Sequence, residues 1–337
     1  MILKYLSKKF LQSSLNNLVN NLEKREFDGV PKISVYDLKR NISVNVNGDS
    51  PGWSASIIKV PIMATAFQEV SKGNLNLEEK LKVNHKFTLE PFDFISTLPE
   101  GAKVSMPNLM YAMIVNSDNE ATNMIADRIG IQTINKSMVS FDMKNSMLAH
   151  LLCPNVPRYT SEFNKDGSNI TTPNDMVNSL RQIYDKKFSK LDENTRKLCD
   201  IVFSWTENYG VKSKGGYISD PDFGEDIHEA GIIDNRLIYT IMLNKVGQKS
   251  IQQRKENKVN NRLDELYWGL EPLFNEFEDG LDIALSCKPK KSSKENELDI
   301  DFSYKPKKSS EEDGFNMRRI SFQKDAKNIL YNYLLFS

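Results

Sequence analysis

The sequence predicts an α+β fold in which helices flank an antiparallel five-stranded sheet and an all-helical subdomain is inserted into the chain. Strand patterns occur before residue 47 and after residue 209, and a long helical stretch separates them. The predicted strands cover 31–37, 41–46, 210–218, 226–233 and 236–244. Strands so far apart in the chain can share one sheet if the intervening helices pack as a unit beside it.

This pattern divides the 337 residues into three parts. A sheet subdomain combines 1–55 with 206–280, and 56–205 forms the helical subdomain. A helix is expected over about 258–275, and 281–337 is a charged linker with a C-terminal extension. The functional site is expected where the first two parts meet, because ligand sites often lie at such junctions.

The N-terminal segment is predicted to be an amphipathic helix over about 3–24. Its apolar residues recur at helical spacing, at Ile2, Leu3, Leu6, Phe10, Leu15, Leu18 and Leu22. Asparagines interrupt any hydrophobic block, so the segment does not resemble a signal peptide. The favoured interpretation is a helix packed on the sheet, and the alternative is a membrane-surface helix. The expected location is cytoplasmic, or extracytoplasmic if a leader was removed.

The C-terminal part contains a short repeat. The six residues Lys-Pro-Lys-Lys-Ser-Ser occur at 288–293 and again at 305–310, with acidic residues between them. A stretch this polar cannot bury enough apolar surface to offset the entropy of ordering. Residues 288–313 are therefore expected to form a mobile linker or an exposed hairpin. Apolar residues return over 315–336, which could dock on the body of the protein or bind a partner.

Composition excludes several function classes. Lys and Arg number 45 and Asp and Glu number 45, so the formal net charge is zero, which argues against nucleic acid as the main partner. No apolar run is long enough to form a transmembrane segment. The cysteines and histidines are widely spaced and predict neither a disulfide framework nor a metal site; they are Cys153, Cys199, Cys287, His85, His150 and His228. No cofactor is expected.

The first candidate motif is Ser56-Ile57-Ile58-Lys59. A serine hydroxyl needs a base to become a nucleophile, and residues three apart on a helix lie on one face. The apolar run that follows predicts a buried helix, with capping hydroxyls offered by Ser54-Ala55-Ser56. Burial would lower the pKa of Lys59 and let it act as a neutral base. Taken alone, Ser56 would more simply be a helix N-cap.

Two further motifs follow in order. Ser117-Asp118-Asn119 is a polar turn between apolar helical segments, which would present its side chains to a site. Lys214-Gly215-Gly216 lies in a strand pattern, where adjacent glycines often mark the close approach of another backbone or a ligand. Taken alone, the lysine motif could equally be an exposed basic turn. The three motifs together form the set of an active-serine enzyme.

With these motifs, the chain resembles the class A β-lactamase and penicillin-binding protein superfamily, and most closely its β-lactamase-related serine hydrolases. Matching stretches run from about 32 to 243 and include Thr171-Thr172-Pro173 and the strand that begins at His228. The resemblance implies a β-lactamase/transpeptidase-like fold. It also implies a small-molecule or peptide substrate, either β-lactam-like or an acyl amide or ester.

The resemblance also implies residue roles. The catalytic residues would be Ser56 as the acylated nucleophile, Lys59 as base or proton relay, Ser117 as proton donor toward the leaving nitrogen, and Lys214 as its partner and anion anchor. Substrate would be bound by Asn119, Gly216 and Tyr217. The backbone N–H groups of Ser56 and Tyr217 would form the oxyanion hole.

Two positions depart from the pattern. The residue after the late lysine is usually Thr or Ser, whose hydroxyl binds the substrate carboxylate, but here it is Gly215. A register that uses Lys212-Ser213 restores the hydroxyl and loses the glycine. The glutamate that activates the deacylating water in the resembling β-lactamases falls on Thr160, which leaves Glu162 as a possible deacylation base.

The predicted function is therefore a β-lactamase-like serine hydrolase that acts through an acyl-enzyme on Ser56, with slow deacylation. One alternative is a DD-peptidase or esterase of the same fold. Another is a non-catalytic binding protein that retains the fold. Gly215 and Thr160 favour the last alternative, whereas the retention of all three motifs opposes it.

Overall fold

The computed structural model describes residues 2–24, 29–87, 93–152, 157–208, 210–221 and 224–248. Its centre is the five-stranded sheet, in the order β2-β1-β9-β8-β7. Every neighbouring pair of these strands is antiparallel. The strands are β1 (Val30–Asp37), β2 (Ile42–Val46), β7 (Val211–Asp220), β8 (Gly224–Ile233) and β9 (Leu237–Val246). The predicted antiparallel sheet is confirmed.

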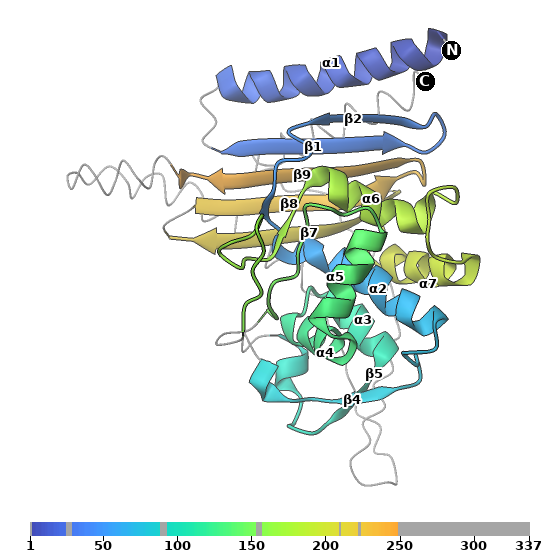
Figure 1. The fold of residues 1–337 in the computed structure, drawn as a ribbon, viewed down its shortest axis with the longest axis vertical. Helices are drawn as coiled ribbons and strands as arrows, with labels where there is room; N and C mark the ends of the chain where they lie inside the picture. The colour runs from blue at the N-terminus through green and yellow to red at the C-terminus, as the bar shows by residue number, and fades with distance from the viewer. Residues whose placement is uncertain are drawn as a thin grey trace, which may run out of the picture.

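The described chain between β2 and β7 contributes the helices that pack on the sheet. They are α2 (Lys59–Ser71), α3 (Met106–Ile114), α4 (Asn119–Ile129), α5 (Ile131–Ser140), α6 (Pro173–Tyr184) and α7 (Glu193–Ser204). Three 3-10 turns are η1 (Ala55–Ile58), η2 (His85–Phe87) and η3 (Ile95–Thr97). The N-terminal helix α1 (Ile2–Lys24) lies beyond β2, on the other side of the sheet strands from these helices (Figure 1).

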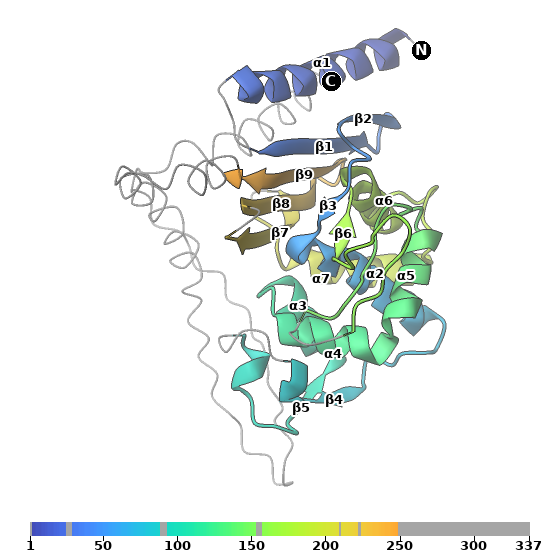
Figure 2. The same ribbon diagram turned by 60° about the vertical axis from the view of Figure 1, so that its left-hand side comes forward.

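Two short antiparallel ladders add strands that the sequence pattern did not predict, and three of their four strands lie in the stretch expected to be helical. One pairs β3 (Gly52–Trp53) with β6 (Ile170–Thr171), and the other pairs β4 (Lys80–Lys82) with β5 (Lys103–Ser105). Figure 2 shows β3 and β6 side by side between the sheet and α2. Two or three residues carry too little periodicity to be predicted from sequence.

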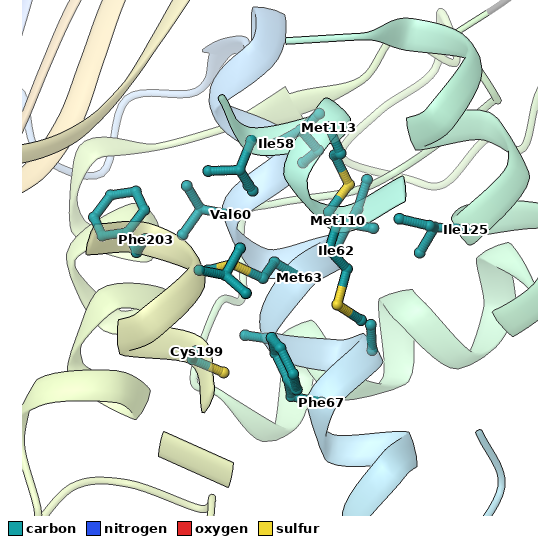
Figure 3. Close-up of a cluster of buried hydrophobic side chains, with 14 of the residues drawn as sticks. Ile58, Val60, Ile62, Met63, Phe67, Met110, Met113, Ile125, Cys199 and Phe203 are labelled. Carbon is teal, nitrogen blue, oxygen red and sulfur yellow. The ribbon is translucent and has the colours of Figure 1, made fainter. Parts of the chain in front are cut away.

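One hydrophobic core joins the helices to the sheet. The alternation of β1, β8 and β9 directs one set of side chains, such as Ala230, Ile238 and Met242, toward α2 and α6. Figure 3 shows the centre of this core, where Ile62 and Met63 of α2 lie beside Met110 and Phe203. Because α2 is surrounded, nearly every one of its residues is buried, including the polar Lys59.

A second, smaller core lies on the opposite face of the sheet. Leu11 and Leu15 of α1 are fully buried there with Ile33, Val35 and Tyr239. The N-terminal helix therefore packs on the sheet, as the favoured interpretation of its sequence predicted. Within the described part of the chain, none of the helices combines the length and the apolarity that crossing a bilayer requires.

Several predictions fall outside the described residues. These are the helix over 258–275, the linker and extension over 281–337, and the positions of Cys153 and Cys287. Cys199 is described, and it is a free, fully buried cysteine. Burial raises the pKa of its thiol well above the ordinary value, which makes it a packing residue rather than a reactive one.

The packing of α1 gives a direct stability test. Leu15→Ala should lower the free energy of unfolding by about 2–5 kcal/mol, because it removes a fully buried side chain from the second core. The matched control is Phe10→Ala on the same helix, where the side chain is 59% exposed and the change should stay within about 0.5 kcal/mol. Chemical denaturation measures both, and equal losses would contradict this packing.

Candidate active site

The Lys59 side chain is the centre of the site. It lies at the start of α2, one turn after Ser56, and none of it is exposed. Its Nζ contacts the Ser117 carbonyl oxygen, lies 3.0 Å from Ser117 Oγ and donates to Asn119 Oδ1 at 2.8 Å. The first two motifs of the sequence, about sixty residues apart, therefore meet through one lysine.

Burial lowers the pKa of Lys59 well below its ordinary value, and the nearby charge of Lys214 lowers it further. The carboxylates of Asp93 and Asp118 act in the opposite direction. A neutral amine has two N–H donors and one lone pair. The carbonyl of Ser117 and the amide oxygen of Asn119 only accept, so in the neutral form of Lys59 they would take its two donors and leave the lone pair for a hydroxyl proton.

The polar turn before α4 holds its shape through Asp118. This residue caps α4, because its Oδ1 accepts from the Ala121 N–H at 2.7 Å. Its Oδ2 accepts from the Ile95 N–H at 2.9 Å, which ties the turn to η3. Ser117 has a φ of 57°, a left-handed conformation that non-glycine residues rarely adopt. Such strain is maintained only where the surroundings fix it.

Lys214 approaches the same serine from the sheet. It lies on β7, and its Nζ donates to Ser117 Oγ at 2.9 Å and to the Gly215 carbonyl at 3.0 Å. Burial lowers the pKa of Lys214 from 10.5 to about 7. Lys212 instead contacts Asp200 at 2.7 Å, away from Ser117. Of the two registers weighed from the sequence, the geometry therefore favours Lys214-Gly215-Gly216.

Gly216 explains why β7 can pass so close to the serine. A Cβ atom at this glycine would lie 3.0 Å from the Ser56 nitrogen and 3.1 Å from the Ile57 nitrogen. Both are backbone atoms of η1, which holds the partly buried Ser56. The backbone N–H of Ser56 and the strand that continues to Tyr217 are thus brought together, as an oxyanion hole requires.

The segment before η1 differs from the expectation that its serines cap the helix. Ser54 makes no side-chain capping bond. Instead its hydroxyl donates to the Asn169 carbonyl at 3.1 Å, because the segment is tied to the chain beside β6. His228 of β8 also holds this segment, since its Nε2 donates to the Trp53 carbonyl at 2.8 Å. This buried contact gives His228 a packing role.

Tyr217 differs from the other candidates because its side chain is 40% exposed. Its hydroxyl lies 3.2 Å from Glu225 Oε1 on the neighbouring strand. The oxyanion-hole role expected for Tyr217 from the sequence concerns its backbone N–H and not this hydroxyl.

Asp93 is a site residue that the sequence did not reveal. It lies just before η3, and its Oδ2 accepts from the Asn119 N–H at 3.0 Å. Burial, followed by the nearby Asp118 carboxylate, raises the pKa of Asp93 to about 6. An isolated Asp has no characteristic spacing to the serine motifs, so only the packing of η3 against α4 could reveal it.

The candidate deacylation loop contributes no buried acid among its described residues. Glu162 and Thr160 are both exposed. Asn164 is buried, and its Nδ2 donates to the Ser168 carbonyl at 2.8 Å within the loop. The chain segment that is fixed to α4 is a different one, because the Asn123 side chain bonds both the N–H and the carbonyl of Leu152, at 2.5 and 2.8 Å.

The assembled geometry is suited to acyl transfer. Ser56 lies one turn before the buried Lys59, and a second hydroxyl, that of Ser117, lies between the amines of Lys59 and Lys214. Protons can pass between these groups while backbone N–H groups stabilise an oxyanion.

The comparisons agree with this geometry. A family model described as the beta-lactamase enzyme family matches residues 11–263. A beta-lactamase from Sphaerobacter thermophilus is 18% identical, with 71% of this chain and 93% of that chain covered and a TM-score of 0.57. PBP-A is 22% identical, with 71% and 93% covered and a TM-score of 0.56. None of the curated proteins compared with the chain matches it.

A related PBP-A structure is titled as an acyl-enzyme complex with penicillin G of a point mutant. It is 22% identical, covers 69% of this chain and 89% of that chain, and has a TM-score of 0.56. At these identities the solved structures show a shared fold, which is the β-lactamase/transpeptidase-like fold.

The two adjacent glycines give a matched pair of variants. Gly216→Ala should impair acylation by about tenfold or more, because its methyl group would meet backbone nitrogens that cannot move without displacing Ser56. Gly215→Ala should leave acylation within about threefold, because the nearest atom to its added Cβ is 4.0 Å away. Labelling rates and thermal unfolding would be compared, and identical behaviour of the two variants would contradict the described approach of β7 to η1.

Proposed function

This chain belongs to the beta-lactamase enzyme family, and we propose that it is a serine hydrolase that acts through an acyl-enzyme on Ser56 and deacylates slowly. The observation that carries the proposal is the shared hydroxyl of Ser117, which lies within 3.0 Å of the amines of both Lys59 and Lys214. Such an arrangement costs the burial of two amines, and catalysis is the clearest reason to retain it.

The proposed acylation follows from the donors and acceptors. The lone pair of Lys59 takes the proton of Ser56 as the serine oxygen bonds to the substrate carbonyl carbon. The resulting oxyanion accepts from the backbone N–H groups of Ser56 and Tyr217. When the carbon–nitrogen or carbon–oxygen bond breaks, Ser117 gives its proton to the leaving atom and is reprotonated from Lys59. The nucleophile's proton thus ends on the leaving group.

Substrate binding would use the groups around this path. The Asn119 side chain would hold the substrate amide, and Lys214 would attract an anionic group. A carboxylate would be held less firmly than in the resembling enzymes, because Gly215 supplies no hydroxyl. The substrate is therefore proposed to be a small molecule or peptide with an acyl amide, ester or β-lactam bond.

Slow deacylation is proposed because the described loop offers no positioned base. Glu162 is solvent-exposed, and Thr160 stands where the resembling β-lactamases carry their glutamate. A general base contributes about 10²–10⁴ in rate, so its loss would raise the hydrolysis barrier by roughly 3–5 kcal/mol. A DD-peptidase or esterase would share the acylation chemistry, whereas a non-catalytic binding protein would form no adduct.

The first test is covalent labelling. A fluorescent penicillin should label the protein on Ser56, and Ser56→Ala should abolish the label. Lys59→Arg keeps a positive charge but cannot act as a neutral base, so it should slow labelling by about 10²–10⁴-fold. Intact-mass measurement checks all three proteins.

Two results would contradict this part of the proposal. Equal labelling of the Ser56→Ala protein would place the nucleophile elsewhere. A loss under about threefold for Lys59→Arg would make Lys59 a structural residue, because general-base help is far larger than that.

The second test is the lifetime of the adduct. Time-resolved mass spectrometry should show a penicillin adduct that survives for minutes or longer, with little hydrolysed penicillin, because no described loop acid is placed to activate water. Rapid loss of the adduct over many turnovers would reveal a deacylation base. Glu162→Gln would then show whether that base is Glu162.

A further inference from the structure

Asp93 places a carboxylate beside Asn119, the residue whose side chain is proposed to hold the substrate amide. Its Oδ2 accepts from the backbone N–H of Asn119, the first residue of α4, at 3.0 Å. The side chain of the same Asn119 accepts from Lys59 at 2.8 Å. The carboxylate and the catalytic lysine therefore contact the two ends of a single residue.

The second carboxylate of this region differs from the first. Asp118 is 1% exposed, and its two oxygens accept from the N–H groups of Ala121 and Ile95. It is therefore committed to holding the turn. Asp93 is only partly buried, which leaves it accessible from solvent and from a bound ligand.

The charge of Asp93 is not cancelled by the lysines of the site. Burial lowers the pKa of both Lys59 and Lys214, that of Lys214 to about 7, so the positive charge on Lys214 is reduced near neutral pH. The pKa of Asp93 is about 6, so this carboxylate is mostly ionised at pH 7. The charge of the site near Asp93 and Asn119 is thus more negative than the presence of two lysines would suggest.

We propose that Asp93 is a specificity residue, and that the site prefers acyl donors with a protonated amine on the carbon next to the amide that Asn119 holds. Peptides and amino-acid derivatives with a free N-terminal ammonium group belong to this class. The inference rests on the proposed function, because it uses Asn119 as the amide-binding group. A positive charge at that carbon would be attracted to the Asp93 carboxylate, and a negative charge would be repelled.

Gly215 supports this preference independently. The missing hydroxyl weakens the capture of an anionic group at the Lys214 side of the site. A site with weaker anion capture on one side and the partly buried Asp93 carboxylate on the other is better matched to a cationic or zwitterionic substrate than to a dianion.

Three penicillins with one common core test the inference. Ampicillin carries an amine on the side-chain carbon beside the amide, penicillin G carries no charge there, and carbenicillin carries a carboxylate. At pH 7 an α-amino group is mostly protonated. The second-order rate of Ser56 acylation should fall in the order ampicillin, penicillin G, carbenicillin.

Asp93→Asn supplies the decisive comparison, because Asn keeps an oxygen that can accept the Asn119 N–H but removes the charge. The ampicillin-to-carbenicillin rate ratio should fall by about three- to thirtyfold relative to the unaltered protein, the range expected for a partly exposed charge interaction. Dividing the two ratios removes the intrinsic reactivity of each penicillin. Asp127→Asn, an exposed acid farther along α4, is the control and should leave the ratio unchanged.

The possible failures are distinguishable. If the three penicillins acylate Ser56 and the ratio is the same in the unaltered and Asp93→Asn proteins, the specificity inference is wrong and the proposed function stands. If Asp127→Asn changes the ratio as much as Asp93→Asn, the effect is one of overall charge, which also overturns the inference. If none of the three acylates Ser56, both the proposed function and the inference fall.

Discussion

The interaction on which the site depends is the shared hydrogen bonding of Ser117 with two buried lysines. Lys59 reaches it from α2 and Lys214 reaches it from β7, while the turn before α4 supplies the serine itself. Removing two amines from water is costly: burial lowers the pKa of both, and the charge of Lys214 lowers that of Lys59 further. The burial of apolar side chains around α2 contributes the stabilisation that offsets this cost, and the same packing fixes the three elements in place.

Close backbone approach is the second constraint, and it explains the glycines of adjacent strands. Gly216 lets β7 meet η1, and Gly231 of β8 lies where a Cβ would be 2.4 Å from the Lys212 carbonyl. Both positions lie on strands that join the sheet to the catalytic region. The sheet that forms part of the core thereby also sets how close β7, which carries Lys214, comes to Ser56. A change in the packing of the sheet would therefore also change the geometry of the site.

Three residues around this centre distinguish the site from the pattern of the resembling enzymes or add charge to it. Asp93 adds a carboxylate near Asn119, Gly215 removes a hydroxyl near Lys214, and the loop acid Glu162 stays in solvent. None of these changes affects the shared hydroxyl of Ser117. Under the proposed function they would act on which substrate is attracted and on how fast the acyl group leaves, because function depends on the site and not on the fold alone.

The sequence by itself determined the five strands of the main sheet, the N-terminal helix and the three motifs, because these depend on local periodicity and on short spacings along the chain. Tertiary structure decided what depends on contacts between distant segments. It favoured the Lys214 register by placing Lys212 beside Asp200, it gave Ser54 a partner other than the helix, and it brought Asp93 to Asn119. No pattern of neighbouring residues encodes such contacts, since each arises only when separate elements pack together.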